Sequence, residues 1–216
     1  MAICPFATRK LIPPGENDPR IEARIVILHV DGGDAESLHD YFAERSGGIE
    51  SHFFVRKDGV VEQYRDTDFE ADANYGANGF AVSIETQGLA SGAWTRNQLR
   101  SIKRLLRWLS RTHGIPLRKV SSSTGSGVGY HVQFGAPGPW TPSAKSCPGP
   151  ERIRQFEKVL VPWMALCRAD ARAAAIRRRV RVSLTRRLRA ALDRSPDRST
   201  TAWLRSVLTV VRRQPE

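Results

Sequence analysis

The segment Arg24–Val30, RIVILHV, constrains the fold of this chain most strongly. It is a continuous run of β-branched and apolar residues, and the turn-forming sequence Asp31-Gly32-Gly33 follows it directly. A short apolar run bounded in this way predicts a buried strand. His29 is therefore expected where this strand meets a glycine-rich turn.

Further strand signals follow along the chain. His52–Lys57 and Val60–Arg65 flank Asp58-Gly59, a dipeptide typical of a two-residue hairpin turn. Phe80–Thr86 is predicted to form the next strand, and Ala35–Arg45 can form a short helix. One antiparallel hairpin is therefore expected within the sheet.

The clearest helix signal begins at Thr95, which forms a capping-box pattern with Gln98. Apolar residues then recur at helical spacing until Gly114. Residues 121–150 are rich in turn-forming residues and predict a long loop, which in a compact domain is usually functional. Strands that alternate with helices indicate an α/β fold, built on a mixed β-sheet flanked by helices.

Most of the positive charge lies in the last quarter of the chain. The formal net charge is +12, yet residues 1–164 hold 20 basic against 18 acidic residues, whereas residues 165–216 hold 14 arginines against 4 acidic residues. Two apolar stripes, Ile176–Leu188 and Leu204–Val211, predict two short basic amphipathic helices there. We therefore divide the chain into an irregular leader (1–24), a central domain (25–164) and a basic helical tail (165–216).

Composition excludes several classes of protein. With 40% hydrophobic and 26% charged residues, the chain is neither collagen-like, mucin-like nor wholly disordered. The three cysteines, Cys4, Cys147 and Cys167, are too few for a disulfide framework. We expect neither a secretory signal nor a membrane span, because the basic-then-apolar pattern and an apolar run of sufficient length are both missing.

His29, His131 and Cys147 are the candidate metal ligands. Two imidazoles and a thiolate supply three ligands to tetrahedral zinc and leave a fourth position for water, as a catalytic zinc requires. The spacing alone leaves an alternative open, because a packed strand histidine, a loop histidine and an unrelated thiol would give the same pattern.

A series of motifs in one order carries a family resemblance. Residues 24–163 resemble the zinc-dependent N-acetylmuramoyl-L-alanine amidases of the peptidoglycan-recognition-protein type, which are common among phage endolysins. The resemblance implies the corresponding fold, a mixed sheet flanked by helices. The matching pieces are IVILHV with His29, the hairpin SHFFVRKDGVVEQY, the segment NGFAVSIE with Asn78 and Glu85, the Thr-x-x-Gln pattern at Thr95, His131, and KSCPGP with Lys145 and Cys147.

The resemblance assigns roles to five of these residues. It implies that His29, His131 and Cys147 bind Zn²⁺, that Glu85 acts as general base and that Lys145 stabilises the tetrahedral intermediate. Taken from the residues alone, Glu85 could also be an exposed strand-end carboxylate and Lys145 a solvated loop lysine.

Substrate contacts are expected from Asn74, Asn78 and His52. The two asparagines could instead belong to an ordinary Asx-turn loop, and His52 could be a structural histidine. Ser51 is a departure from the family, since several members carry a catalytic tyrosine there. This departure leaves Glu85 as the preferred base.

The implied function is hydrolysis of the amide between N-acetylmuramic acid and the L-alanine of the stem peptide in bacterial peptidoglycan. We expect a monomeric phage endolysin that is made in the cytoplasm without a signal peptide and acts on the cell wall after release. Two alternatives stay open: a non-catalytic peptidoglycan-recognition module, and, more weakly, a nucleic-acid-binding protein that uses the basic tail. The tail itself could bind an anionic wall polymer or membrane surface, or pack on the central domain with its arginines solvated.

Overall fold

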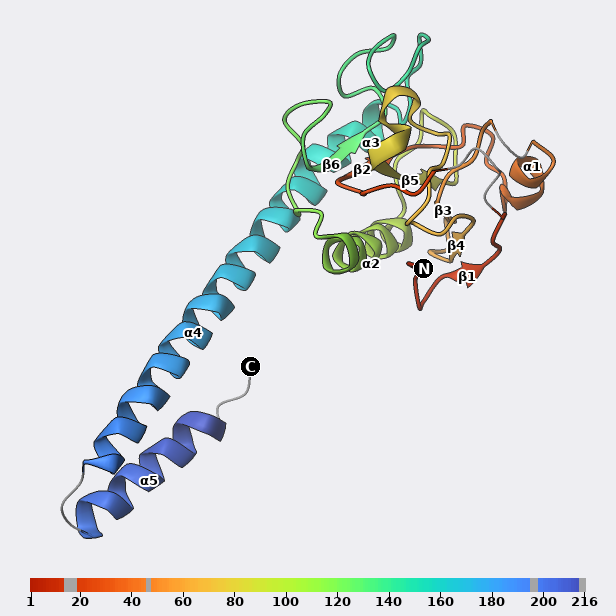
Figure 1. Ribbon diagram of the computed structural model, residues 1–216. Coiled ribbons are helices and arrows are strands. Elements are labelled where there is room, and N and C mark those ends of the chain that lie inside the picture. Colours follow the sequence, from red (N-terminus) through yellow and green to blue (C-terminus); the bar gives the residue numbers. More distant parts are fainter. Residues whose placement is uncertain (14–18, 46–47, 195–197, 214–216) are drawn as a thin grey trace. The chain divides into compact units, whose positions relative to one another are not determined.

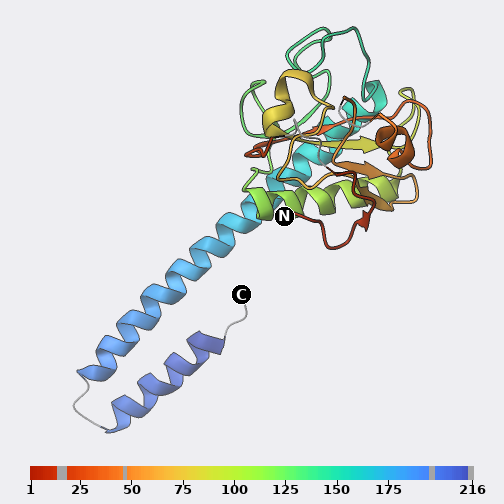
Figure 2. The same cartoon turned by 45° about the vertical axis from the view of Figure 1, so that its right-hand side comes forward.

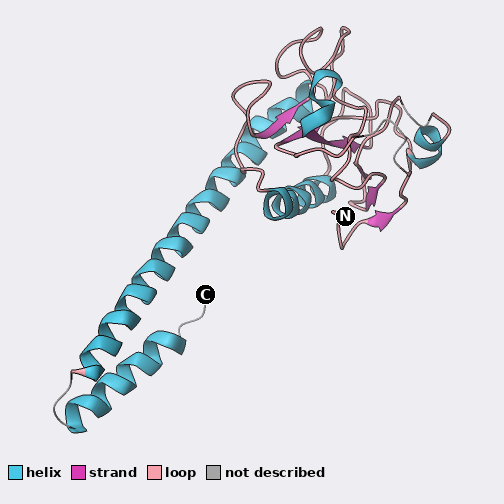
Figure 3. Cartoon of the chain, viewed as in Figure 1, coloured by secondary structure: helices cyan, strands magenta, loops and turns pink. Residues whose placement is uncertain are grey.

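The computed structural model describes residues 1–13, 19–45, 48–194 and 198–213. The chain divides into two compact units, Met1–Ala165 and Leu166–Glu216. All strands among the described residues lie in the first unit, which holds a six-stranded sheet, whereas the described part of the second unit is helical (Figures 1 and 3).

The sheet of the first unit has the strand order β1-β4-β3-β5-β2-β6. Only β3 and β4 pair in the antiparallel sense, and every other neighbouring pair is parallel. The predicted mixed sheet is therefore confirmed. The strands are β1 (Thr8–Arg9), β2 (Ile25–Leu28), β3 (Phe53–Val55), β4 (Val61–Gln63), β5 (Ala81–Thr86) and β6 (Gly127–Tyr130).

Helices flank this sheet. Figure 2 shows α2 running along one face of the strands. The helical elements are α1 (His39–Ala43), the 3-10 helix η1 (Tyr75–Phe80), α2 (Arg96–His113), α3 (Pro150–Gln155), the π-helical turn η2 (Phe156–Leu160), α4 (Val161–Asp193) and α5 (Arg198–Arg213).

The central strand β2 is covered on both faces, which explains its continuous apolar run. Val26 and Leu28 belong to the main core, which also includes the buried face of α2 and the residues Phe156, Leu160 and Met164. Ile25 and Ile27 point to the opposite face and pack with a second cluster that includes Trp140. A strand buried on both sides has no need of polar alternation.

The prediction for α2 is confirmed in detail. Thr95 accepts a hydrogen bond from the Gln98 backbone, and the Gln98 side chain accepts one from the Thr95 backbone, so the capping box is complete. Gly114 ends the helix in the left-handed conformation, with φ of 70°. The hairpin between β3 and β4 is also confirmed, but its turn has three residues, Lys57-Asp58-Gly59, instead of the expected two, because Val55 pairs with Val61 and the Arg56 N–H donates to the Val60 carbonyl.

Three of the predicted segments differ in the structure. The prediction of one long loop over residues 121–150 misses the edge strand β6, Gly127–Tyr130, which pairs in parallel with β2. Its glycines have low β-propensity and therefore hide the strand signal. Gly129 is nevertheless required in this strand, because a Cβ at this position would lie 2.9 Å from the Trp140 ring. The helix expected over Ala35–Arg45 is limited to α1, and Thr8–Arg9 in the leader pairs with β4.

Two short helices were expected in the tail, but the first of them is part of a long helix, α4. α4 has 33 residues, and no glycine or proline occurs between Pro162 and Pro196 to interrupt it. In the second unit, α5 folds back along α4, and Leu188 packs with Leu204 and Leu208. Among the described residues, no helix is both long enough and apolar enough to cross a membrane.

Candidate metal centre

Three neighbouring parallel strands bring the central candidate residues together. Leu28 of β2 lies in register with Ile84 of β5 and with Tyr130 of β6. The next residue on each strand is His29, Glu85 or His131. The rings of His29 and His131 are 4.3 Å apart between centroids, and Glu85 Oε1 is 3.8 Å from His29 Nδ1. The sheet register therefore places two imidazoles and a carboxyl at one edge.

Each imidazole is held through its outer nitrogen. His29 Nε2 lies 2.8 Å from Asn74 Oδ1, and His131 Nε2 lies 3.0 Å from the Trp140 carbonyl. Both partners are acceptors, so both Nε2 atoms carry the proton and both Nδ1 atoms present a lone pair. His131 Nδ1 is buried and has no hydrogen-bond partner in the described part of the chain. Ligating histidines are typically oriented in this way.

Cys147 completes the cluster from the loop that follows β6. Its Sγ accepts a hydrogen bond from the Val30 backbone at 3.3 Å and lies 3.7 Å from His29 Nδ1. The ligand atoms of His29, His131 and Cys147 all lie within 4.8 Å of one another. Zinc–ligand bonds of the usual length place tetrahedral ligand atoms about 3.3–3.6 Å apart, so a small closure of this cluster would hold the ion.

The protonation states also suit a metal. Burial lowers the pKa of His29 well below its ordinary value, and the neighbouring His131 lowers it further. Burial and the charge of Lys145 lower the pKa of His131 to about 4. Both imidazoles are thus neutral at pH 7, as metal ligands must be. Burial raises the pKa of the Cys147 thiol, and a cation at this position would offset that effect by favouring the thiolate.

Glu85 lies beside the cluster without a partner for one of its oxygens. Glu85 Oε2 is buried and unpaired within the described residues. Burial and the charge of Asp31 raise the pKa of Glu85 to about 8, while Lys145 and Arg152 oppose the rise. A carboxyl with this pKa can both accept and release a proton near neutral pH.

Lys145 is exposed and lines the same cavity as Glu85. Its charge lowers the pKa values of both His29 and His131, which places the ammonium in the field of the cluster. Lys145 thus shares the cavity with the candidate ligands and acts on them through its charge.

A cavity of about 920 Å³ opens over the cluster. Its walls come from the loops after β2 and β6 and from the segments around α1 and η1. Tyr75 lies at its rim with 61% of its surface exposed, although its backbone φ is positive at 49°. The lining includes His29, Asp31, Tyr41, Ile49, Glu50, Asp72, Tyr75, Asn78, Glu85, His131, Lys145 and Cys147.

Of the three residues expected to contact substrate, only Asn78 lines the cavity. Asn74 is fully buried and accepts from His29, so it positions a candidate ligand. Asn78 lines the cavity, but its side chain is bonded to the Asn74 backbone and to Asp72. His52 is fully buried, bonded to Ser83 and to the Phe69 carbonyl, and is absent from the cavity lining. The geometry therefore gives His52 a structural role.

Two supporting residues have no counterpart among the sequence predictions. Asp31 accepts hydrogen bonds from the Ala35 and Gly88 backbones and fixes the turn after His29. Arg152 is 1% exposed and donates to the carbonyls of Leu89, Gly92 and Pro148, which ties α3 to the loop after β5. A buried arginine of this kind carries no local sequence signal, because its partners are backbone carbonyls.

Comparison with known proteins agrees with this architecture. Residues 18–150 match the family described as N-acetylmuramoyl-L-alanine amidase. The endolysin amidase LysCS from Clostridium intestinale URNW is 18% identical with a TM-score of 0.54, covering 74% of this chain and 99% of that one. Drosophila peptidoglycan recognition protein SA is 15% identical with a TM-score of 0.52, covering 71% of this chain and 92% of that one. Peptidoglycan recognition protein LE in complex with tracheal cytotoxin is 14% identical with a TM-score of 0.53, covering 71% of this chain and 93% of that one.

No curated protein matches the sequence significantly. At these identities the structural likenesses show a shared fold. The family match extends over more than half of the chain and includes β2, the hairpin, β5, β6 and all three candidate ligands. The chain therefore belongs to the N-acetylmuramoyl-L-alanine amidase family.

Proposed function

We propose that this protein hydrolyses the amide between the lactyl group of N-acetylmuramic acid and the L-alanine of the stem peptide. The observation that carries the proposal is the convergence of His29, His131 and Cys147 at the floor of one cavity, in a chain of the amidase family. These three residues would hold the zinc ion. A zinc ion in such a site activates water at neutral pH and polarises a carbonyl.

The protein groups around the cluster supply the proton transfers. The Glu85 carboxylate would take a proton from the attacking water and pass it to the leaving amine nitrogen of the L-alanine. Its raised pKa of about 8 keeps both forms of the carboxyl accessible at neutral pH. Ser51 cannot replace the tyrosine of other family members, because it is buried and its hydroxyl donates to the Phe53 carbonyl. Glu85 is therefore the base that we assign.

Lys145 supplies positive charge at the cavity wall. An ammonium there stabilises the negative charge that develops on the scissile carbonyl oxygen. The remainder of the cavity is large enough for several residues of a stem peptide. Peptidoglycan recognition protein LE, which has the same fold, forms a complex with a monomeric diaminopimelic acid-type peptidoglycan. Asn78 and Tyr75 line the part of the cavity that would receive the peptide.

The biological setting that we propose is that of an endolysin. LysCS, which has the same fold, is named as an endolysin amidase. In this proposal the monomeric protein is made in the cytoplasm and acts on the wall after release. Its basic second unit adds attraction to an anionic surface of the cell envelope, either a wall polymer or a membrane.

Mass spectrometry of the products released from purified sacculi tests the reaction. The zinc-loaded protein should release stem peptides with a free N-terminal L-alanine, and Cys147→Ser should release none. New reducing sugar ends would identify a glycosidase instead. Tight binding to sacculi with no product would leave the non-catalytic recognition module as the function.

A further inference from the structure

The second unit presents two different surfaces side by side on α4. One is an apolar groove of about 840 Å³, whose floor consists of Ile176, Val180 and Leu184 of α4 with Val210 and Val211 of α5. Arg177, Arg178 and Arg181 also line it. The other is a polar hollow of about 650 Å³ along the neighbouring side of the helix.

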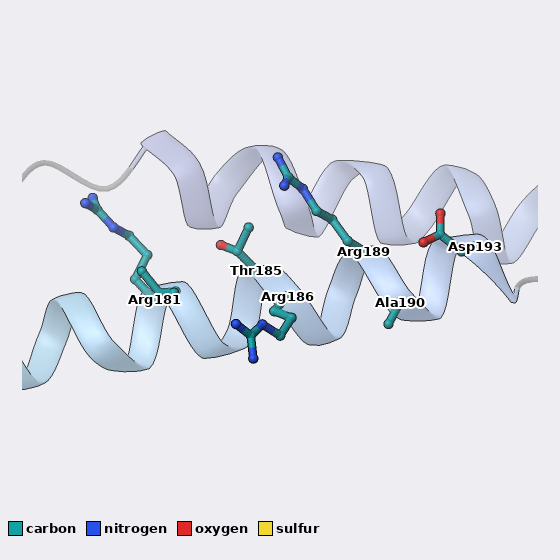
Figure 4. Close-up of a pocket in the computed structure, with 7 residues that line it drawn as sticks. Arg181, Thr185, Arg186, Arg189, Ala190 and Asp193 are labelled. Atoms are coloured by element: carbon teal, nitrogen blue, oxygen red, sulfur yellow. The ribbon is translucent and has the colours of Figure 1, made fainter.

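The polar hollow is built from residues four positions apart. Figure 4 shows Arg181, Thr185, Arg189 and Asp193 along one side of α4, with Arg186 on the other side. Arg181 lines both the hollow and the apolar groove. Positive charge and apolar surface therefore adjoin within one helical turn.

The apolar stripe of α4 is covered at only one end. Leu188 is 9% exposed because it packs against Leu204 and Leu208 of α5. Ile176 and Val180 continue the same stripe and remain 63% and 60% exposed. Apolar side chains in such a row gain free energy by leaving water.

The charge of this unit selects the kind of partner. Residues 165–216 hold 14 arginines, 4 acidic residues and no lysine. Guanidinium groups bind phosphate through two parallel hydrogen bonds, which an ammonium cannot do. A second copy of the unit would be repelled by the same charge, so the partner must be anionic.

A soluble polyanion would bind the arginines through its charge but would leave the apolar groove exposed to water. We propose that the second unit binds an anionic phospholipid bilayer, with the arginines on the lipid phosphates and Ile176, Val180 and Leu184 buried at the interface with the acyl chains. A surface that combines clustered arginine with exposed apolar side chains matches this boundary. This inference rests on the attraction to an anionic surface proposed above, and it identifies that surface as phospholipid.

Vesicle co-sedimentation of the full-length protein tests the proposal. Vesicles of equal parts phosphatidylglycerol and phosphatidylcholine should bind the protein, vesicles of phosphatidylcholine alone should bind it at least tenfold more weakly, and added salt should weaken binding to the anionic vesicles. Arg177→Gln/Arg178→Gln should lower the affinity by about fivefold for each charge removed.

A matched pair of valines separates insertion from charge attraction. Val180 lines the apolar groove, whereas Val182 lines the polar hollow, although their exposed fractions are similar at 60% and 57%. Val180→Gln should weaken binding to the anionic vesicles by about fivefold, and Val182→Gln by less than twofold. Circular dichroism of both variants verifies that α4 remains helical.

Two results would overturn the proposal. One is that Val180→Gln and the wild type bind the anionic vesicles equally, and that the wild type binds duplex DNA or teichoic acid in a salt-sensitive manner with the same affinity as it binds the vesicles. Charge alone would then explain the binding by the second unit. The other is no preference for phosphatidylglycerol. The assay contains no peptidoglycan, so neither result depends on whether the protein is an amidase.

Discussion

His29 and Asn74 are joined across 45 residues of sequence by a hydrogen bond of 2.8 Å between Nε2 and Oδ1. Asn74 precedes η1 and is fully buried, so its amide position is fixed by the packing around it. Because this contact fixes the proton on Nε2, it sets which nitrogen of His29 faces the cluster. Asn74 is thus a positioning residue for the metal centre.

Replacing Asn74 tests this relationship. We expect Asn74→Ala to weaken zinc affinity by about 10- to 100-fold, because His29 loses the acceptor that orients it. Asn74→Asp keeps an oxygen acceptor at the same place and should restore most of the affinity. Competition with a zinc-binding dye measures both. If the two variants bind zinc equally weakly, packing at residue 74 matters and the hydrogen bond does not.

Removing any ligand should remove metal and activity together. His29→Ala, His131→Ala and Cys147→Ser each leave two ligands, fewer than an open catalytic zinc site requires. Elemental analysis should find about one zinc per wild-type chain and much less in each variant. Cys167→Ser, which changes a thiol outside the cluster, is the matched control and should retain its zinc. Full zinc content in the three ligand variants would refute the assignment.

Glu85 and Lys145 should affect catalysis without affecting metal binding. Glu85→Gln removes the base and should lower kcat by about 100-fold or more, with zinc content unchanged. Lys145→Ala should lower kcat by a similar factor through loss of charge stabilisation. Lys158→Ala, at an exposed lysine outside the cavity lining, should leave kcat unchanged. A fully active Glu85→Gln enzyme would mean that another group is the base.

His52 should make stability depend on pH. Its burial lowers its pKa from 6.5 to about 4, so the unfolded chain binds the proton more readily than the folded protein. The resulting stability is complete above pH 6.5 and is lost as the pH falls toward 4, by about 3 kcal/mol in total.

His52→Gln keeps a donor for the Phe69 carbonyl but does not titrate. We therefore expect the free energy of unfolding, measured with urea at a series of pH values between 6.5 and 4, to depend less steeply on pH in the variant than in the wild type. The difference in slope should correspond to about one bound proton. Parallel slopes for the two proteins would show that His52 is accessible to protons in the folded state.

The first unit should fold without the second. Its main core ends with Met164 among the residues that the structure describes, so a chain that stops at Ala165 retains Phe156, Leu160 and Met164. We expect this truncated protein to keep its activity on soluble muropeptides and a melting temperature within a few degrees of the wild type. It should lose its affinity for anionic vesicles. An insoluble product would show that the tail is part of the amidase fold.

Features encoded by neighbouring residues could be predicted from the sequence. The strand β2, the β3–β4 hairpin and the capped helix α2 depend on local patterns, and all three are present, although the hairpin turn has three residues instead of two. The metal cluster followed from His29, His131 and Cys147 because a family resemblance linked positions that lie about a hundred residues apart.

Features that depend on distant packing could not be predicted. The strand β6 lacks a side-chain signal because Gly129 must make room for the Trp140 ring. Asn74 comes to lie beside His29, and Arg152 among four backbone carbonyls, only once the loops have packed. The buried state of His52 likewise results from its contacts with Ser83 and Phe69.

The register of three strands also determines when the candidate metal ligands can first come together. His29 directly follows β2, the second strand in sequence order, but its partner His131 follows β6, the last strand of the sheet to be synthesised. A nascent chain that lacks Gly127–Tyr130 has only one of the two imidazoles, and a sheet shifted by one residue would turn one of them to the opposite face. The candidate ligands His29 and His131 can therefore lie side by side only after β6 has paired with β2 in the correct register.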